Sequence, residues 1–268
     1  MIRILGLSRL CCLSVVLPVA LAGDPRAELW HGTPLGEADR RCTFRVESGN
    51  VVMHPVERLP VVMHLSSDLP PEIVDAAIEA MRRWNRGWAR HLMARYEGDP
   101  FGSGKTDFGV VSLQLFGWRS FESELKAADD GVNAIVPSEG APARRMAVTS
   151  ISWTSGPPTA SSPGSQDTGS SITDADIEVY MHKRPRVNYG EGLPGRREMD
   201  ALSVMAHELG HVLGLGHSDR EKDSVMTFPL MEGARVLPSA TDYENLLCAY
   251  GAGLRRHRSD GGPVQRPE

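Results

Sequence analysis

Short β-rich runs and longer stretches with apolar residues at helical spacing follow one another along this chain of 268 residues. Five runs of mainly apolar residues indicate short strands, at residues 59–65, 108–116, 131–136, 146–154 and 172–180. After the first run, six apolar side chains recur at helical spacing: Ile73, Ala77, Met81, Trp84, Trp88 and Leu92. This stripe predicts a helix that packs one face on a sheet, and Asp68 followed by Pro70 and Pro71 marks its start.

Two further helices are predicted in the last third of the chain. The first begins near residues 198–200, and its apolar side consists of Leu202, Met205, Ala206, Leu209 and Val212. The second spans residues 239–250, with Ser239 or Thr241 as its N-cap and Gly251 as its stop. Residues 155–171 are rich in Ser, Gly, Pro and Thr and predict a flexible loop, and residues 185–197 predict a second loop.

The helix after residue 200 carries the pattern with the clearest chemistry. His207, Glu208, His211, Gly214 and His217 form an H-E-x-x-H-x-x-G-x-x-H motif. Residues four apart lie on one face of a helix, about 6 Å apart, so His207 and His211 can point two imidazoles at one ion. Zinc suits them because it takes neutral imidazole nitrogen in a tetrahedral shell. Glu208 lies about a quarter-turn away, where its carboxylate reaches a metal-bound water without binding the metal.

Gly214 explains how a third ligand arrives. Glycine can take the left-handed conformation that ends a helix, and the chain then turns back toward the metal. Without that turn, six extended residues would carry His217 roughly 20 Å from His211. Three His ligands leave the fourth position for water, which is typical of a catalytic rather than a structural zinc site.

Met226 follows the motif and is preceded by Ser and Val. These residues resemble the metzincin clan of zinc endopeptidases, in which a methionine turn lies beneath the metal. Within the clan, Ser218 after the third His and Phe228 with the Pro that follows it resemble the matrixins, with one extra residue before the Pro. The likeness is to short bacterial matrixin-like catalytic domains. It extends over residues 59–251 and is strongest at the zinc segment.

The resemblance implies an α+β fold: a twisted, mostly parallel sheet with one antiparallel edge strand, two long helices, a Met-turn and a C-terminal helix. Residues 146–154 would be the edge strand, where an extended substrate adds as a further strand. The alternative is an ordinary solvated edge. Met226 would pack under the site without binding the metal, and the residues after it would form a wall of the specificity pocket.

One catalytic zinc ion is expected, and calcium is left open. Asp174, Asp176 and Glu178 could help to hold calcium as in larger matrixins, although alternate acids on a strand also form a solvated face. The His and Asp cluster that holds structural zinc in vertebrate matrixins is not matched, because His182 stands alone.

The resemblance and the motif together predict a secreted zinc-dependent endopeptidase. It would hydrolyse peptide bonds of extended polypeptides with a zinc-activated water, with Glu208 as general base. Two alternatives remain: an inactive zinc-binding module for adhesion or recognition, and a zinc amidase that acts on a small ligand. An intact Glu208 argues against the first, and the expected edge strand argues against the second.

Composition and termini restrict the setting. A net charge of -5 and a pI near 6.0 give no case for binding nucleic acid or an anionic membrane. Residues 1–22 carry two Arg, an apolar stretch and a final Ala-Leu-Ala, which predicts a secretory signal cleaved after Ala22. The apolar stretch is too short for a comfortable membrane span, and no lipoprotein anchor is indicated. We therefore expect a secreted or periplasmic monomer that meets protein or peptide substrates.

The expected division of the chain is a signal peptide (1–22), an N-terminal segment of uncertain role (23–57), the catalytic domain (58–251) and a disordered tail (252–268). Only Cys42 and Cys248 remain after signal cleavage, and export permits a disulfide between them. Larger matrixins use a propeptide cysteine to block the zinc. Cys42 lacks the Pro and Gly of that motif, so the disulfide is the prediction and latency the alternative.

Overall fold

The computed structural model describes residues 46–47, 50–55, 58–95, 114–120, 125–139, 146–155, 170–181, 186–190, 192–218, 223–247 and 250. Its elements in chain order are β1 (Val46–Glu47), β2 (Asn50–Met53), β3 (Val61–Leu65), α1 (Pro71–Arg95), β4 (Phe116–Ser120), β5 (Ala134–Ser138), β6 (Ala147–Ser155), β7 (Ser170–Tyr180), β8 (Arg186–Asn188), β9 (Glu198–Asp200) and α2 (Ala201–Val212). Residues 240–247 form a further helix.

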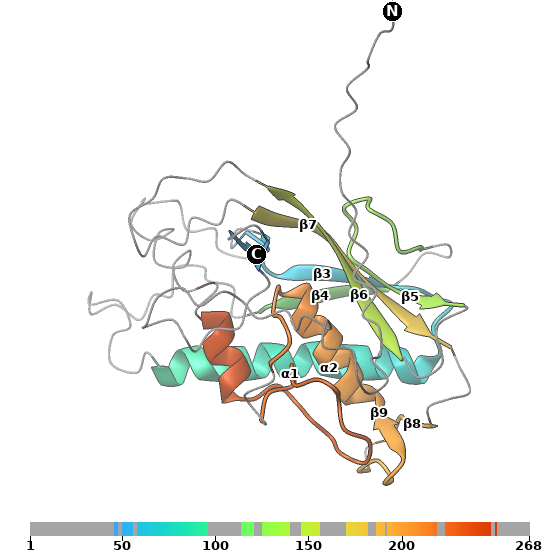
Figure 1. The fold of residues 1–268 in the computed structure, drawn as a ribbon. Helices are drawn as coiled ribbons and strands as arrows, with labels where there is room; N and C mark the ends of the chain where they lie inside the picture. The colour runs from blue at the N-terminus through green and yellow to red at the C-terminus, as the bar shows by residue number, and fades with distance from the viewer. Residues whose placement is uncertain are drawn as a thin grey trace, which may run out of the picture.

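The main sheet is mostly parallel and confirms the expected α+β fold. Its strands follow the order β1-β2-β7-β5-β3-β4, and β6 pairs with β7. Strands β2, β3, β4, β5 and β7 are parallel to their neighbours among these five, whereas β6 runs antiparallel along the whole of β7. Strand β1 forms a short antiparallel pair with β2. Figure 1 shows the two long helices on the same side of this sheet.

Helix α1 forms where the apolar stripe predicted it. All six stripe residues are at most 2% exposed. Burial of large side chains such as Trp84 and Trp88 stabilises the fold by about 2–3 kcal/mol each. The Trp84 ring nitrogen also donates to the carbonyl of Ala206 over 2.9 Å, and this bond fastens α2 to α1. Trp84 therefore fixes α2 on α1, and Trp88 adds to the buried face of α1.

Asn85 of α1 determines where β4 begins. Its side-chain oxygen accepts from the backbone nitrogens of Leu115 and Phe116 at 2.8 and 2.9 Å, and its amide donates to the Phe116 carbonyl. The end of the strand expected at residues 108–116 differs from the structure, because β4 starts at Phe116 and continues to Ser120. Residues 108–113 lie outside the described part of the chain. Apolar alternation cannot show that a side chain 30 residues away holds the strand entrance.

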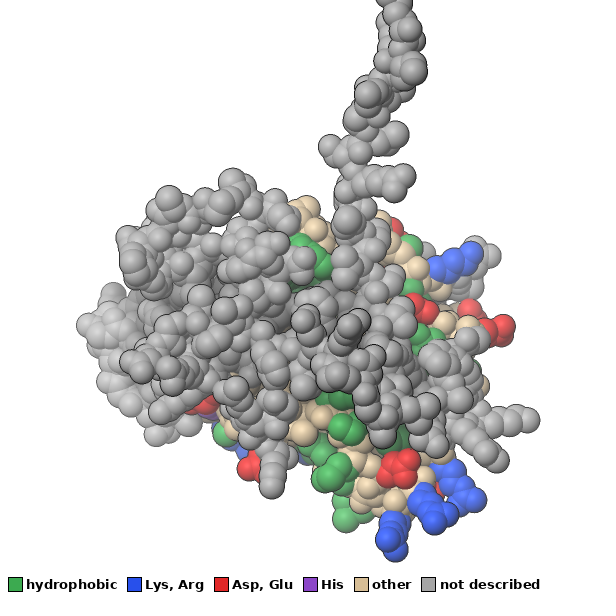
Figure 2. Space-filling model, in the orientation of Figure 1, with side chains coloured by type: hydrophobic (Ala, Val, Ile, Leu, Met, Phe, Trp, Pro, Cys, Tyr) green, Lys and Arg blue, Asp and Glu red, His purple; other side chains and the backbone are tan. Residues whose placement is uncertain are grey.

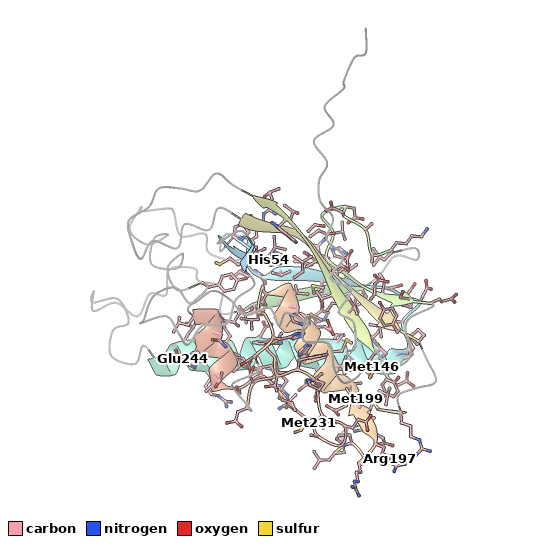
Figure 3. All side chains as sticks on the ribbon, in the orientation of Figure 1. His54, Met146, Arg197, Met199, Met231 and Glu244 are labelled. Carbon is pink, nitrogen blue, oxygen red and sulfur yellow. The ribbon has the colours of Figure 1, made fainter. Side chains whose placement is uncertain are left out.

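The N-terminal segment contributes to the sheet, which the sequence did not indicate. Strand β2 pairs in parallel with the start of β7, with Val52 opposite Ser170. His54, directly after β2, is only 3% exposed and lies inside the molecule close to the sheet (Figure 3). The strand predicted at residues 59–65 is present as β3, but it follows two earlier strands. The domain boundary at residue 58 stays a prediction.

The remaining predictions concern the loop before α2 and the segments outside the described residues. The loop predicted at residues 185–197 contains β8, which pairs in parallel with β9 just before α2. The signal peptide, the C-terminal tail, His182, Cys42 and Cys248 lie outside the described residues, so those predictions stay open. None of the helices in the described part of the chain has the length and apolar character needed to cross a membrane.

Candidate metal centre and active site

Helix α2 begins and ends at the residues that the motif requires. Asp200 caps its start by accepting from the backbone nitrogen of Ser203 at 3.0 Å. At its end Gly214 has a φ of +91°, and the Leu215 nitrogen donates to the Gly210 carbonyl over 3.0 Å. The Gly214 nitrogen also donates to the His211 carbonyl over 2.8 Å, which completes a Schellman cap. The predicted turn after the helix is confirmed.

Glycine is needed at position 214 for a second reason, which the sequence did not reveal. A Cβ added there would lie 2.4 Å from the carbonyl oxygen of Val52 in β2. The backbone of β2 therefore passes directly against the turn that delivers His217. Any larger residue would meet both an unfavourable φ and a fixed strand.

The turn brings the three histidines together, as their spacing predicted. The Nε2 atoms of His207, His211 and His217 form a triangle with all three sides at 3.2 Å. For a tetrahedral ion with Zn–N bonds of 2.0–2.1 Å, the expected separation is about 3.3 Å. The residues present therefore fit zinc, with one tetrahedral position left for another ligand.

Backbone carbonyls set the tautomer of two of these histidines. Nδ1 of His207 lies 2.7 Å from the carbonyl oxygen of Val225, and Nδ1 of His211 lies 2.8 Å from that of Leu215. A carbonyl can only accept, so each Nδ1 carries the proton and each Nε2 turns a lone pair toward the centre of the triangle. Such lone pairs repel one another unless a cation lies between them.

His217 is kept neutral by its surroundings. Burial, and then the charge of His207, lower the pKa of His217 to about 3. Its ring stacks on Phe228, with ring centres 4.7 Å apart. A neutral imidazole is the form that binds a metal, so His217 is prepared for coordination.

The Met-turn lies under the histidines. Met226 is 1% exposed, and a Cβ added to Gly210 of α2 would come within 2.2 Å of its sulfur. The turn is held by Asp242, whose carboxylate accepts from the Ser224 hydroxyl and from the Val225 nitrogen at 2.5 and 3.1 Å. Because the Val225 carbonyl binds His207, Asp242 supports a metal ligand through two connected contacts.

Residues 157–251 match the family model of matrixin, and this stretch contains the three histidines, Glu208, the Met-turn and Asp242. This part of the chain is similar to the matrixins, and with the three-histidine group it supports a matrixin-like metzincin. No curated protein matches the chain significantly. The family match and the three-histidine group support a zinc metallopeptidase in general terms.

In this matrixin-like domain Glu208 lies beside the metal centre and is 8% exposed. Its Oε2 accepts a hydrogen bond from the hydroxyl of Thr149 in β6 over 2.6 Å. The ligand atoms that converge on one point belong to the three histidines alone among the described residues, and Glu208 is not one of this group. The sequence did not single out Thr149. The signal was available in the alternation of β6, which turns Ala147, Thr149 and Ile151 inward.

A second unpredicted contact joins the segment after the Met-turn to the start of α2. The Arg235 guanidinium donates to both carboxylate oxygens of the buried Asp200, with a shortest distance of 2.8 Å. It also donates to the carbonyls of Gly190 and Gly192. One side chain thus pins three segments at the start of the helix that carries the metal ligands.

Two of the three acidic residues of β7 act as structural acceptors. Asp176 accepts from the backbone nitrogens of Ala128 and Ala134 at 2.8 Å, and Glu178 accepts from the Ser138 hydroxyl at 2.7 Å. Burial, followed by the charge of Asp174, raises the pKa of Asp176 to about 7. Calcium, which the sequence left open, has no support among the described residues.

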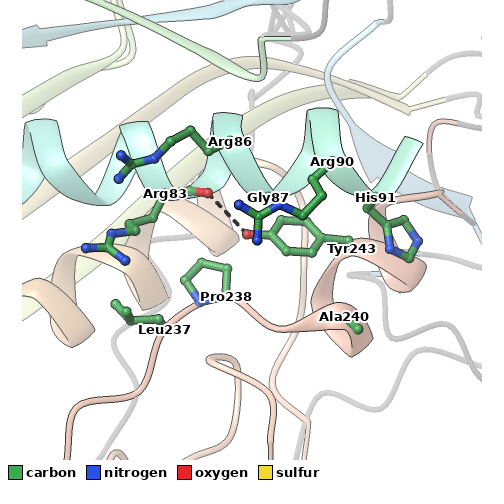
Figure 4. Close-up of a pocket in the computed structure, with 9 residues that line it drawn as sticks. All are labelled: Arg83, Arg86, Gly87, Arg90, His91, Leu237, Pro238, Ala240 and Tyr243. Atoms are coloured by element: carbon green, nitrogen blue, oxygen red, sulfur yellow. Dashed lines mark hydrogen bonds between the residues drawn. The ribbon is translucent and has the colours of Figure 1, made fainter. Parts of the chain in front are cut away.

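A separate pocket of about 580 Å³ opens between α1 and the segment that leads to the last helix (Figure 4). Arg83, Arg86 and Arg90 line it, and the ring of Tyr243 lies directly against Gly87 of α1. Arg83 and Arg86 both bind Glu79, at 2.6 and 2.8 Å. None of the metal-binding histidines lines this pocket, so it is not the catalytic cleft.

Proposed function

We propose that this protein is a secreted, monomeric zinc endopeptidase that cleaves extended polypeptides. The observation that carries the proposal is the triangle of three imidazole nitrogens with sides of 3.2 Å, next to the buried carboxylate of Glu208. The first feature fits zinc, and the second is a proton acceptor that does not bind the metal.

His207, His211 and His217 would hold the ion. When bound there, zinc supplies Lewis acidity that polarises a carbonyl and makes water acidic enough to ionise near neutral pH. Glu208 takes the proton from the attacking water and hands it to the departing amine. A general base of this kind contributes roughly 10²–10⁴-fold to the rate.

The substrate would lie along β6. This strand pairs with β7 on one side, and no described strand pairs with its other edge. An extended peptide can add there through backbone hydrogen bonds, and alternate side chains then face the protein. Thr149 connects this strand directly to Glu208, so the substrate edge and the base are adjacent.

Apolar side chains beside the site support an apolar substrate pocket. Phe228 and Met231 follow the Met-turn and are 39% and 65% exposed. Figure 2 shows hydrophobic side chains on the lower part of the molecule, below the sheet, with basic side chains at the corner of β8 and β9. We therefore expect a preference for an apolar side chain next to the cleaved bond.

The experiment is cleavage of a fluorogenic peptide library and of an unfolded protein by the mature chain. Hydrolysis should stop with a chelator and return when zinc is added, and mass spectrometry should find new termini inside the polypeptides. A zinc-loaded, folded protein that cleaves none of these substrates would overturn the proposal. Release of a small amide only would favour the amidase alternative.

Secretion rests on the predicted signal. Sequencing the N-terminus of protein recovered outside the cytoplasm should give Gly23 as the first residue if cleavage follows Ala22. Protein that keeps Met1 and stays in the cytoplasm would contradict this part of the proposal. Light scattering of the same material should give the mass of one chain.

A further inference from the structure

The contact between β6 and the catalytic helix is a short hydrogen bond between two buried side chains. Thr149 and Glu208 are 7% and 8% exposed, and the Thr149 oxygen lies 2.6 Å from Oε2. The same hydroxyl lies 3.2 Å from the backbone carbonyl of Glu208. A hydroxyl has one proton to donate, and 2.5–2.7 Å is the range of a charge-assisted bond to a carboxylate. The proton therefore belongs to the bond with Oε2.

Packing alone does not explain a threonine at this position. The inward neighbours on β6 are Ala147 and Ile151, which are 8% and 4% exposed. Valine has nearly the same shape as threonine and is also enriched in strands, so it would fill the space without a buried hydroxyl. What threonine adds is a single donor aimed at the carboxylate.

We infer that Thr149 is a positioning residue for the base: its hydroxyl holds Oε2 of Glu208 so that Oε1 is the oxygen that exchanges the proton with the reacting groups. This inference rests on the proposed peptidase function. It goes beyond that function because it assigns a residue that orients the base, in addition to the metal and the base themselves. This residue comes from the strand on which the substrate is proposed to lie.

The proton balance is the same at each stage. Oε1 gains a proton from water and later gives it to the leaving amine, while the Thr149 proton stays on its own oxygen. Oε2 accepts the Thr149 bond whether or not Oε1 carries a proton. Thr149 therefore limits rotation of the carboxylate throughout the cycle without taking part in the transfer.

The test compares Thr149→Val with Thr149→Ser in the zinc-loaded full chain. The valine variant should lose about 10–100-fold in kcat, the size typical for loss of an outer partner, with KM changed by less than about 2-fold. The serine variant should keep kcat within about 3-fold of the wild type because it keeps the donor. Thr241→Val, in the last helix, makes the same change outside β6 and is the matched control.

Two readouts separate positioning from packing. Combined with Glu208→Gln, the valine change should cost no further activity, because its effect passes through the base. Crystals of the zinc-loaded valine variant should show the Glu208 carboxylate rotated or in two positions. If the valine variant folds poorly, Thr149→Ala set against Thr149→Ser gives the same comparison.

The outcomes distinguish this inference from the proposed function. A wild-type protein without peptide hydrolysis defeats the proposed function itself. An active wild type whose valine variant has unchanged kcat overturns the role of Thr149 and leaves the peptidase intact. A serine variant as impaired as the valine variant also overturns it, since the methyl group would then be what matters.

Discussion

The two walls of the site are built differently. On the sheet side, β6 reaches α2 through one hydroxyl, that of Thr149, and its contact is the carboxylate of Glu208. On the Met-turn side, the buried carboxylate of Asp242 holds Ser224 and Val225, and the Val225 carbonyl holds His207. The sheet wall therefore orients the base, whereas the Met-turn wall orients a metal ligand. Substitutions on the two sides should fail in different ways, one in turnover and the other in metal retention.

The largest effect is expected on the sheet side, at the base itself. Glu208→Gln keeps the shape of the side chain and removes its ability to take a proton, so kcat should fall by roughly 10²–10⁴-fold. Metal analysis should still find about one zinc per chain. A variant that loses zinc together with activity would make Glu208 a ligand and remove the contrast between the walls.

The second prediction concerns a ligand on the other side. His217→Ala removes one corner of the 3.2 Å triangle, and a methyl group offers no lone pair to the metal. Zinc affinity should fall by well over the ~100-fold that loss of an outer partner costs. Competition with a chromophoric chelator measures it. Unchanged, stoichiometric zinc would place the third ligand elsewhere, with His182 the next residue to replace.

Asp242→Ala tests the indirect support of His207. Removal of the carboxylate leaves the Ser224 hydroxyl and the Val225 nitrogen without their buried acceptor, which should cost about 2–4 kcal/mol of unfolding free energy. Zinc affinity should fall by ~10–100-fold. Urea unfolding and chelator competition give the two values. A variant that loses turnover at full zinc occupancy would contradict the proposed division of labour.

Acid should act in opposite directions on two groups of buried residues in and beside the sheet. Burial lowers the pKa of His54, near the end of α2, to about 4, so its stabilising contribution is present above pH 6.5 and is lost as pH falls toward 4. In β7, burial first and neighbouring acids second raise the pKa of Asp174 to about 6 and that of Asp176 to about 7. Their contribution is full below the unfolded pKa near 4 and is lost as pH rises through the folded values.

The smallest predicted effect is the slope that His54 gives to this pH dependence, at most about 1.4 kcal/mol per pH unit. His54→Gln removes the titration and should flatten the loss of stability between about pH 6.5 and 4 relative to the wild type. Urea unfolding of both proteins at each pH cancels the contribution of the metal-binding histidines. Parallel curves for the two proteins would show that His54 does not titrate as a buried group.

The sequence predicted the metal centre better than its supports. His207 and His211 lie one turn apart on α2, where spacing alone determines which side chains converge, and Gly214 follows just after the end of that helix. Thr149 meets Glu208 across 59 residues and Arg235 meets Asp200 across 35, so no local pattern relates them. The helices were predicted well for the same reason: α1 depends on its own stripe of apolar residues.

Strands were harder to place because their partners decide where they begin. Strand β2 is short, and it exists because Val52 pairs with Ser170, more than a hundred residues later. His54 is buried as a result, although the apolar run before it does not show which strand it pairs with. Strand β4 likewise starts where Asn85 holds its backbone.

The contact between Gly214 and Val52 bears on how this protein can be shortened. A version that begins at residue 58, the apparent edge of the catalytic domain, would lack the strand whose carbonyl lies against the metal-delivering turn. It would keep every residue of the zinc motif and lose the surface that confines the third histidine. A shortened version should therefore keep residue 50 onward, because β2, which supports the turn after α2, precedes the zinc motif by about 150 residues.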